Sequence, residues 1–131
     1  MKEDVRTNMF EDVVVEESTS LLKGKYTGTV RDIIRDSSKY DYTRYTVDID
    51  GVNTTINLSY PTKVTFNADG EPTSQHAKFL VKLGIKANAG IKFGLLINQI
   101  IGKKISFMIE NIERNGTTYY QINKESIKLF P

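Results

Sequence analysis

Apolar and polar side chains alternate with a period of two along most of the chain beyond its first twenty residues. In the first alternating segment, Leu22, Tyr26 and Val30 share one parity, while polar side chains such as Thr27 occupy the other. This pattern is typical of a β-strand that buries one face. The following segment, 34–41, is polar and rich in turn-forming residues, so we expect an exposed loop there.

Two more strands are expected after this loop, joined by a glycine turn. The alternating runs 44–49 and 52–60 flank the pair Asp50-Gly51. An Asp-Gly pair between alternating runs is a strong local signal for a tight β-hairpin. Pro61 closes the second run, because proline has no N–H to donate to a strand ladder.

Helical signals follow the third strand. Thr73 or Ser74 can cap a helix over 75–83, and Gly84 is a suitable stop. Apolar residues within 91–101 indicate a second short helix. The stretch between the third and fourth strands is therefore expected to be largely helical.

The chain returns to alternation near its end. The run 105–110 is followed by 112–114 and 117–122, which are separated by the pair Asn115-Gly116. Asn-Gly is the preferred pair for a two-residue type I′ turn. The last two strands should therefore form a hairpin.

The expected order is three strands, a helical segment and two strands, which is the order of the OB-fold, a partly open Greek-key barrel. We therefore expect a mainly β protein, a five-stranded OB-fold barrel with a helical insertion between strands 3 and 4, formed by residues 21–131. Residues 1–20 are expected to be a flexible acidic leader. An SH3-like barrel, the main alternative, does not need the connection of about forty residues that follows Tyr60.

Composition fits one globular domain and adds a hint about the partner. The chain has 131 residues, of which 39% are hydrophobic, so a single core is expected. The net charge of +2 is unevenly distributed, because residues 1–17 carry −4 and residues 18–131 carry +6. A basic body is compatible with binding a polyanion, although an ordinary solvated surface can carry the same charge.

Other features of the composition bear on compartment. The sequence contains no cysteine, which excludes disulfides, thiolate nucleophiles and cysteine-ligated zinc. No run reaches the roughly 18 consecutive apolar residues of a membrane span, and the first residues lack the pattern of a secretory signal. We therefore expect a cytoplasmic protein without a membrane partner.

Several short segments, spread over residues 22–129, resemble those of a known family. They are GKYTGTV at 24–30, YTVDIDG at 45–51, LSYP at 58–61, FLVKLG at 79–84, and IGKK at 101–104 leading to ERNG at 113–116. In layout and in these segments the chain resembles the single-stranded DNA-binding proteins that phages and mobile elements of Gram-positive bacteria encode. The resemblance implies an OB-fold and non-catalytic, largely sequence-independent binding of single-stranded DNA during replication or recombination, with replication or recombination proteins as further partners. Housekeeping bacterial relatives usually end in an acidic tail that recruits partners, whereas this chain ends in IKLFP, which puts recruitment of that kind in doubt.

Binding a single strand without sequence preference requires cations for the phosphates and exposed aromatic rings for the bases. Basic and tyrosine side chains are interleaved around the first predicted loop, and Tyr119 has the parity opposite to that of the expected core residues Tyr120 and Ile122. The predicted nucleic-acid-binding residues are Lys25, Arg31, Arg35, Lys39, Tyr40, Tyr42, Arg44, Lys104, Arg114 and Tyr119. Tyrosines also populate strands as packing residues, so the cluster carries more weight than any one member.

Enzymatic interpretations find little support in the sequence. His76 is the only histidine and lies at the start of a predicted helix, which leaves little material for a metal site or a Ser-His pair. Asp48 and Asp50, with Glu110, could hold magnesium for a nuclease, but the hairpin turn is the simpler explanation of Asp50. We expect no catalysis, no metal and no cofactor.

A different class of function stays open, namely a protein-interaction or assembly module of a phage or mobile element that does not bind nucleic acid. A homodimer is also compatible with a small barrel that has exposed strand edges.

Overall fold

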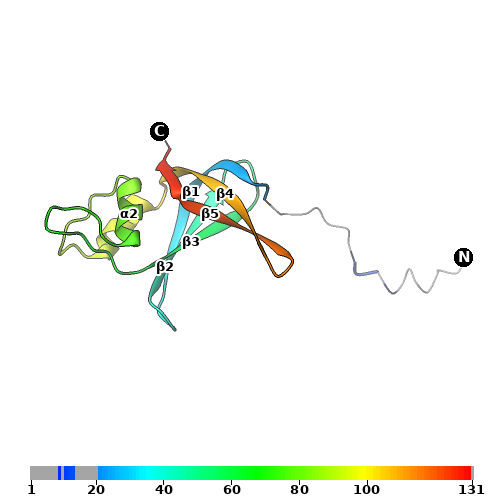
Figure 1. The fold of residues 1–131 in the computed structure, drawn as a ribbon, viewed down its shortest axis with the longest axis horizontal. Helices are drawn as coiled ribbons and strands as arrows, with labels where there is room; N and C mark the ends of the chain where they lie inside the picture. Colours follow the sequence, from blue (N-terminus) through cyan, green and yellow to red (C-terminus); the bar gives the residue numbers. More distant parts are fainter. Residues whose placement is uncertain (1–8, 10, 14–20, 131) are drawn as a thin grey trace, which may run out of the picture.

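The computed structural model describes residues 9, 11–13 and 21–130, and most of the expected leader, 1–20, lies outside the described residues. Five strands form one antiparallel sheet in the order β3-β2-β1-β4-β5, and the short helices lie to one side of it (Figure 1). The elements are β1 (Gly24–Asp36), β2 (Tyr42–Ile49), β3 (Thr55–Pro61), α2 (Gln75–Lys82), the 3₁₀ helix η1 (Phe93–Leu96), α3 (Ile97–Ile100), β4 (Lys104–Arg114) and β5 (Thr117–Leu129). The expected mainly β composition, with helices between the third and fourth strands, is confirmed.

The sheet is curved but not closed. Its two outer strands are β3 and β5, and no ladder of backbone hydrogen bonds joins them in the described part of the chain. A side chain bridges this seam instead, because the Lys124 ammonium on β5 donates to the Ser59 carbonyl on β3 at 2.6 Å.

The core lies on the concave face of the sheet, beneath α2. Inward side chains of all five strands are buried there, and α2 adds Phe79 and Leu80. The Phe79 ring lies 4.7 Å from the rings of both Tyr45 and Tyr60, measured between centroids. Burial of Tyr45 and Tyr60 agrees with their parity in the sequence.

A β-bulge at Arg31 changes which face of β1 points inward. Val30 pairs with Val47, but Asp32 pairs with Thr46, so β1 has one extra residue at this point. Beyond the bulge, the odd-numbered residues Ile33 and Arg35 share the inner face of the sheet with Tyr45 and Thr43, their partners on β2.

The structure corrects two loop predictions. The segment 34–41 is not all loop, because β1 continues to Asp36 in register with Tyr42. The turn at Asp50-Gly51 is wider than a two-residue hairpin, and β3 begins only at Thr55. The Asp50 carboxylate is held outside the turn by the Thr27 hydroxyl at 2.7 Å, and the turn closes through a hydrogen bond from the Ile49 N–H to the Thr54 carbonyl.

The final hairpin matches its prediction at the turn but not in its packing. Asn115 and Gly116 both have positive φ, 51° and 77°, as a type I′ turn requires. However, Tyr120 is exposed, contrary to the expected core position. β1 begins at Gly24, which pairs with Ile109 of β4. The part of the β4–β5 hairpin beyond Ile109 therefore has no third strand of the described chain paired with it, and Tyr120 lies in this part.

The helical segment also follows its sequence signals. The Ser74 hydroxyl accepts a hydrogen bond from the Ala77 N–H at 3.1 Å and so caps α2. The helix expected within 91–101 is present as η1 and α3. None of the helices in the described part of the chain has the length and apolar character needed to cross a bilayer.

Candidate nucleic-acid interface

Exposed aromatic and basic side chains gather at the β1–β2 hairpin. Tyr40 is 66% exposed and Tyr42 is 41% exposed. Their rings meet edge to face with centroids 6.3 Å apart, and the Lys39 ammonium lies 5.7 Å from the centroid of the Tyr40 ring. We call Lys39, Tyr40, Tyr42 and Arg44 the aromatic hairpin. The arrangement offers π-faces and cations to solvent side by side.

Arg35 has a different role from its neighbours. Its guanidinium forms a two-pronged contact with Asp41, with Nε to Oδ1 at 2.8 Å and Nη2 to Oδ2 at 2.5 Å. The hydrogen bond from Arg35, followed by one from Thr62, lowers the pKa of Asp41 to about 2. Unlike Lys39 and Arg44, Arg35 thus has an acidic partner within the hairpin loop.

The outer face of β2 and β3 next to the aromatic hairpin carries polar side chains. Arg44 lies opposite Ser59, and Thr46 lies opposite Asn57 with their side chains 3.2 Å apart in a hydrogen bond. Arg44 also lies close enough to Asp36 to lower its pKa, although hydrogen bonds from Ser38 to that carboxylate contribute more.

The β4–β5 hairpin carries a second group of predicted residues. Arg114 and Tyr119 line a shallow pocket of about 300 Å³ together with Tyr120, which the sequence prediction had assigned to the core. Tyr119 is 55% exposed. The two hairpins that carry the exposed tyrosines project from the same, lower side of the molecule in Figure 1.

Three other predicted cations lie away from these two groups. Arg31 pairs with Asp48 at 3.4 Å, and Lys104 pairs with Asp50 at 3.1 Å. Lys25 is exposed on β1 opposite Met108. Among the described residues, Lys25, Lys39, Arg44 and Arg114 form no ion pair with a carboxylate, which leaves their charges available to a ligand.

Each of the residues considered for catalysis contacts other groups of the described chain. His76 is fully buried, and its ring contacts the Tyr45 hydroxyl and the Thr62 carbonyl. Glu110 accepts a hydrogen bond from Asn123 at 2.8 Å. With Asp48 and Asp50 each paired to a cation, the described residues contain no group of three potential metal ligands.

Sequence reasoning missed one basic site, at the seam between β3 and β5. Lys78, Lys82 and Lys124 line a pocket there. Lys78 and Lys82 are four residues apart, which places both on one face of α2, and this spacing was the available signal. The contribution of Lys124 depends on a long-range contact that the sequence does not reveal.

No protein-family model matches the chain, and no curated protein shows a significant match to it.

Proposed function

We propose that this protein binds single-stranded DNA, without catalysis and largely without sequence preference. The observation that carries the proposal is the aromatic hairpin, where two solvent-exposed tyrosine rings adjoin two cations without a carboxylate ion pair among the described residues. Stacking of a base on an aromatic side chain contributes about 1–3 kcal/mol, and nearby cations neutralise the phosphates.

The strand order supports an OB-type barrel as the scaffold. The order β3-β2-β1-β4-β5, with α2 between β3 and β4, agrees with that arrangement, in which the β2–β3 face and the β1–β2 and β4–β5 loops contact oligonucleotides. The aromatic hairpin and the pocket at Tyr119 lie at these two loops and at the ends of the strands that they join. We therefore propose that one strand crosses the outer face of β2 and β3, with bases stacked on Tyr40, Tyr42 and Tyr119.

By the resemblance noted in the sequence, the biological setting we propose is the replication or recombination of a phage or mobile element in the cytoplasm. The protein would coat exposed single strands there, and replication or recombination proteins would be its further partners.

The experiment that tests the function compares a fluorescent dT oligonucleotide with a duplex of equal length by anisotropy at two salt concentrations. We expect preference for the single strand and weaker binding at higher salt, because binding releases counterions. The double variant Lys39→Gln/Arg44→Gln should lose affinity. The charge-matched control Lys86→Gln/Lys128→Gln removes two exposed cations elsewhere and should bind like the parent.

Two outcomes would count against the proposal. Equal loss in both double variants would indicate general charge attraction without a defined site. Absence of any salt-sensitive preference for the single strand would overturn the function and leave the protein-interaction module as the better interpretation.

A further inference from the structure

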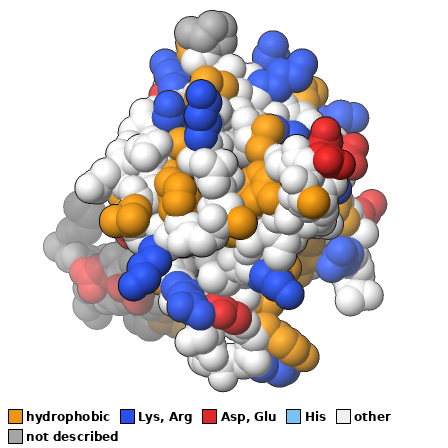
Figure 2. Space-filling view, turned by 90° about the vertical axis from the view of Figure 1, so that its left-hand side faces the viewer, with side chains coloured by type: hydrophobic (Ala, Val, Ile, Leu, Met, Phe, Trp, Pro, Cys, Tyr) orange, Lys and Arg blue, Asp and Glu red, His pale blue; other side chains and the backbone are white. Residues whose placement is uncertain are grey.

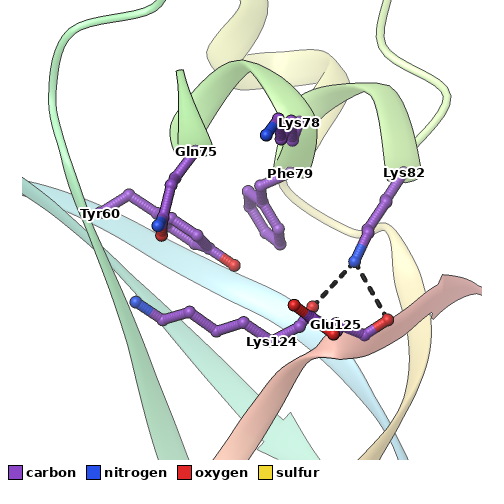
Figure 3. A pocket seen from close by; sticks show the side chains of 7 residues that line it. All are labelled: Tyr60, Gln75, Lys78, Phe79, Lys82, Lys124 and Glu125. Atoms are coloured by element: carbon purple, nitrogen blue, oxygen red, sulfur yellow. Dashed lines mark hydrogen bonds between the residues drawn. The ribbon is translucent and has the colours of Figure 1, made fainter. Parts of the chain in front are cut away.

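A basic pocket of about 240 Å³ lies at the open seam of the sheet (Figure 3). Its roof is α2, its floor is β5 and its side is β3. Figure 3 shows the Phe79 and Tyr60 rings facing into it, with lysines around the rim. The lining residues are Tyr60, Gln75, Lys78, Phe79, Lys82, Lys124 and Glu125.

A large bulge in β5 contributes two residues, Lys124 and Glu125, to the lining of this pocket. Ser106 pairs with Lys128 and Met108 with Asn123, so β5 advances five residues while β4 advances two. The Ser126 hydroxyl stabilises the bulge by accepting a hydrogen bond from the Met108 N–H at 2.8 Å and donating one to the Asn123 carbonyl at 2.6 Å. These hydrogen bonds hold the bulge in a defined conformation, in which residues 124 and 125 do not pair with β4.

Lysine side chains then cover the backbone carbonyls that the bulge and the seam expose. The Lys82 ammonium donates to the carbonyls of Lys124 and Glu125 at 2.9 and 3.1 Å. The Lys124 ammonium donates to the Ser59 carbonyl and lies 4.4 Å from the centroid of the Tyr60 ring. Each ammonium has three N–H donors, so both retain donating capacity for a ligand.

The pocket has more positive than negative charge. Lys78, Lys82 and Lys124 face a single acid, Glu125, and none of the three forms an ion pair with a carboxylate of the described residues. Partial burial lowers the pKa of Lys124. Figure 2, seen from the side that carries α2, shows more basic than acidic side chains among the described residues.

This pocket adjoins the proposed strand path through one residue of β3. Ser59 has Arg44 opposite it on β2, and its carbonyl binds the Lys124 ammonium of β5. Cross-strand neighbours lie about 5 Å apart. Ser59 therefore has a cation on each side, Arg44 on β2 and Lys124 on β5, which links the proposed strand path to the seam pocket.

We propose that the seam pocket binds a phosphate group of the single strand that crosses the β2–β3 face, and so extends the binding site beyond β3. This inference rests on the proposed function. If the strand follows this path, only an oligonucleotide that is long enough to extend past β3 to the seam contacts Lys78 and Lys124.

The test compares dT oligonucleotides of about 5 and about 16 nucleotides, within the range of site sizes of OB domains. The variants are Lys78→Gln and Lys124→Gln, and the matched control is Lys86→Gln, an exposed lysine outside the pocket. For the longer oligonucleotide each pocket variant should reduce the magnitude of the salt slope by about 0.7, because one fewer counterion is released. Binding of the shorter oligonucleotide should be unchanged.

The outcomes separate the two proposals. If the parent binds the longer oligonucleotide and both pocket variants behave like Lys86→Gln, the seam pocket is not part of the strand path and only this inference fails. If the parent binds neither oligonucleotide, the proposed function fails and this inference with it. If Lys124→Gln unfolds because the Ser59 carbonyl loses its donor, Lys78→Gln alone decides, since the Lys78 ammonium has no hydrogen bond to the described residues.

A second experiment distinguishes a phosphate of single-stranded DNA from a free anion as the ligand of the pocket. Inorganic phosphate is titrated into the ¹⁵N-labelled protein, and the amide shifts of α2 and residues 124–126 are followed. Saturable shifts with phosphate, combined with pocket variants that leave oligonucleotide binding unchanged, would assign the pocket to a free phosphate and overturn the strand assignment.

Discussion

At the scale of single residues, His76 shows how the core fixes one protonation state. The Thr62 carbonyl can only accept, so Nδ1 carries the proton and donates to it at 3.0 Å. Nε2 is then the acceptor for the Tyr45 hydroxyl. Burial lowers the pKa of His76 below its usual 6.5, and the backbone hydrogen bonds offset this only in part. The neutral ring is the one that the site accommodates.

Acidification should therefore destabilise the protein through this residue. The unfolded chain takes up a proton near pH 6.5 and the folded chain only at lower pH, so the contribution is fully present above about pH 6.5 and is lost below it. The loss is at most about 1.4 kcal/mol per pH unit for one proton. Urea denaturation between about pH 7.5 and 5.5 measures it. His76→Gln should have a lower free energy of unfolding that does not change across this pH range. A parent protein whose free energy of unfolding is also independent of pH would contradict the assignment.

Gly28 is a second residue whose identity the packing dictates. A Cβ at this position would lie 2.6 Å from the Asp48 carbonyl oxygen and 2.7 Å from Val47 Cγ1. Gly28→Ala should therefore lower the free energy of unfolding by about 1–3 kcal/mol, as overpacking of a core does. Gly94→Ala is the control, because nothing lies within 4 Å of its added Cβ. Equal midpoints in thermal unfolding of both variants would show that β1 can move away from β2.

At the scale of elements, the β1–β2 hairpin allows stacking to be separated from charge. Tyr40→Ala should weaken binding of a dT oligonucleotide of about 16 nucleotides by about 1–3 kcal/mol without changing the salt slope, because no charge is lost. Tyr40→Phe keeps the ring and should bind nearly like the parent. Anisotropy titrations at several salt concentrations measure both quantities. If Tyr40→Phe loses as much affinity as Tyr40→Ala, the hydroxyl is the contact and stacking on Tyr40 is refuted.

The elements also show which structural signals are local. Asn115-Gly116 specifies its turn because both residues accept positive φ, and Ser74 caps α2 within its own helical turn. Asp50-Gly51 resembles the first case, but Asp50 is engaged by Thr27, which is distant in sequence, and the turn widens. The bulges at Arg31 and after Asn123 leave no pattern in the alternation of the sequence. Local chemistry was therefore predictable, and register was not.

The residues of the candidate site also fall into those that the sequence predicted and those that it did not. The sequence placed Tyr40, Tyr42 and Arg44 near one loop, and the fold keeps them together on the hairpin. It could not show that Arg35 is held by Asp41, because both are exposed residues of one polar segment. The seam pocket was invisible for another reason, since Lys124 meets Ser59 only after the sheet curves.

At the scale of the whole molecule, the two hairpins are separate elements that project from the same side (Figure 1). The aromatic hairpin and the pocket at Tyr119 share no lining residue. If one strand spans both, Tyr40 and Tyr119 act as two independent stacking platforms. Contributions from well-separated residues without shared partners add, to within about 0.5 kcal/mol.

The double variant Tyr40→Ala/Tyr119→Ala tests whether one strand uses both platforms. For a dT oligonucleotide of about 16 nucleotides, the loss in binding free energy should equal the sum of the two single losses, because the strand contacts both rings at once. For one of about 5 nucleotides, each single variant should lose little, because the strand can still bind at the other hairpin, whereas the double variant should lose binding. Isothermal titration calorimetry with both lengths measures these energies, and thermal unfolding confirms that the variants stay folded. If Tyr119→Ala binds both lengths like the parent, the strand does not reach the β4–β5 hairpin, and the path must run from the aromatic hairpin towards the seam pocket alone.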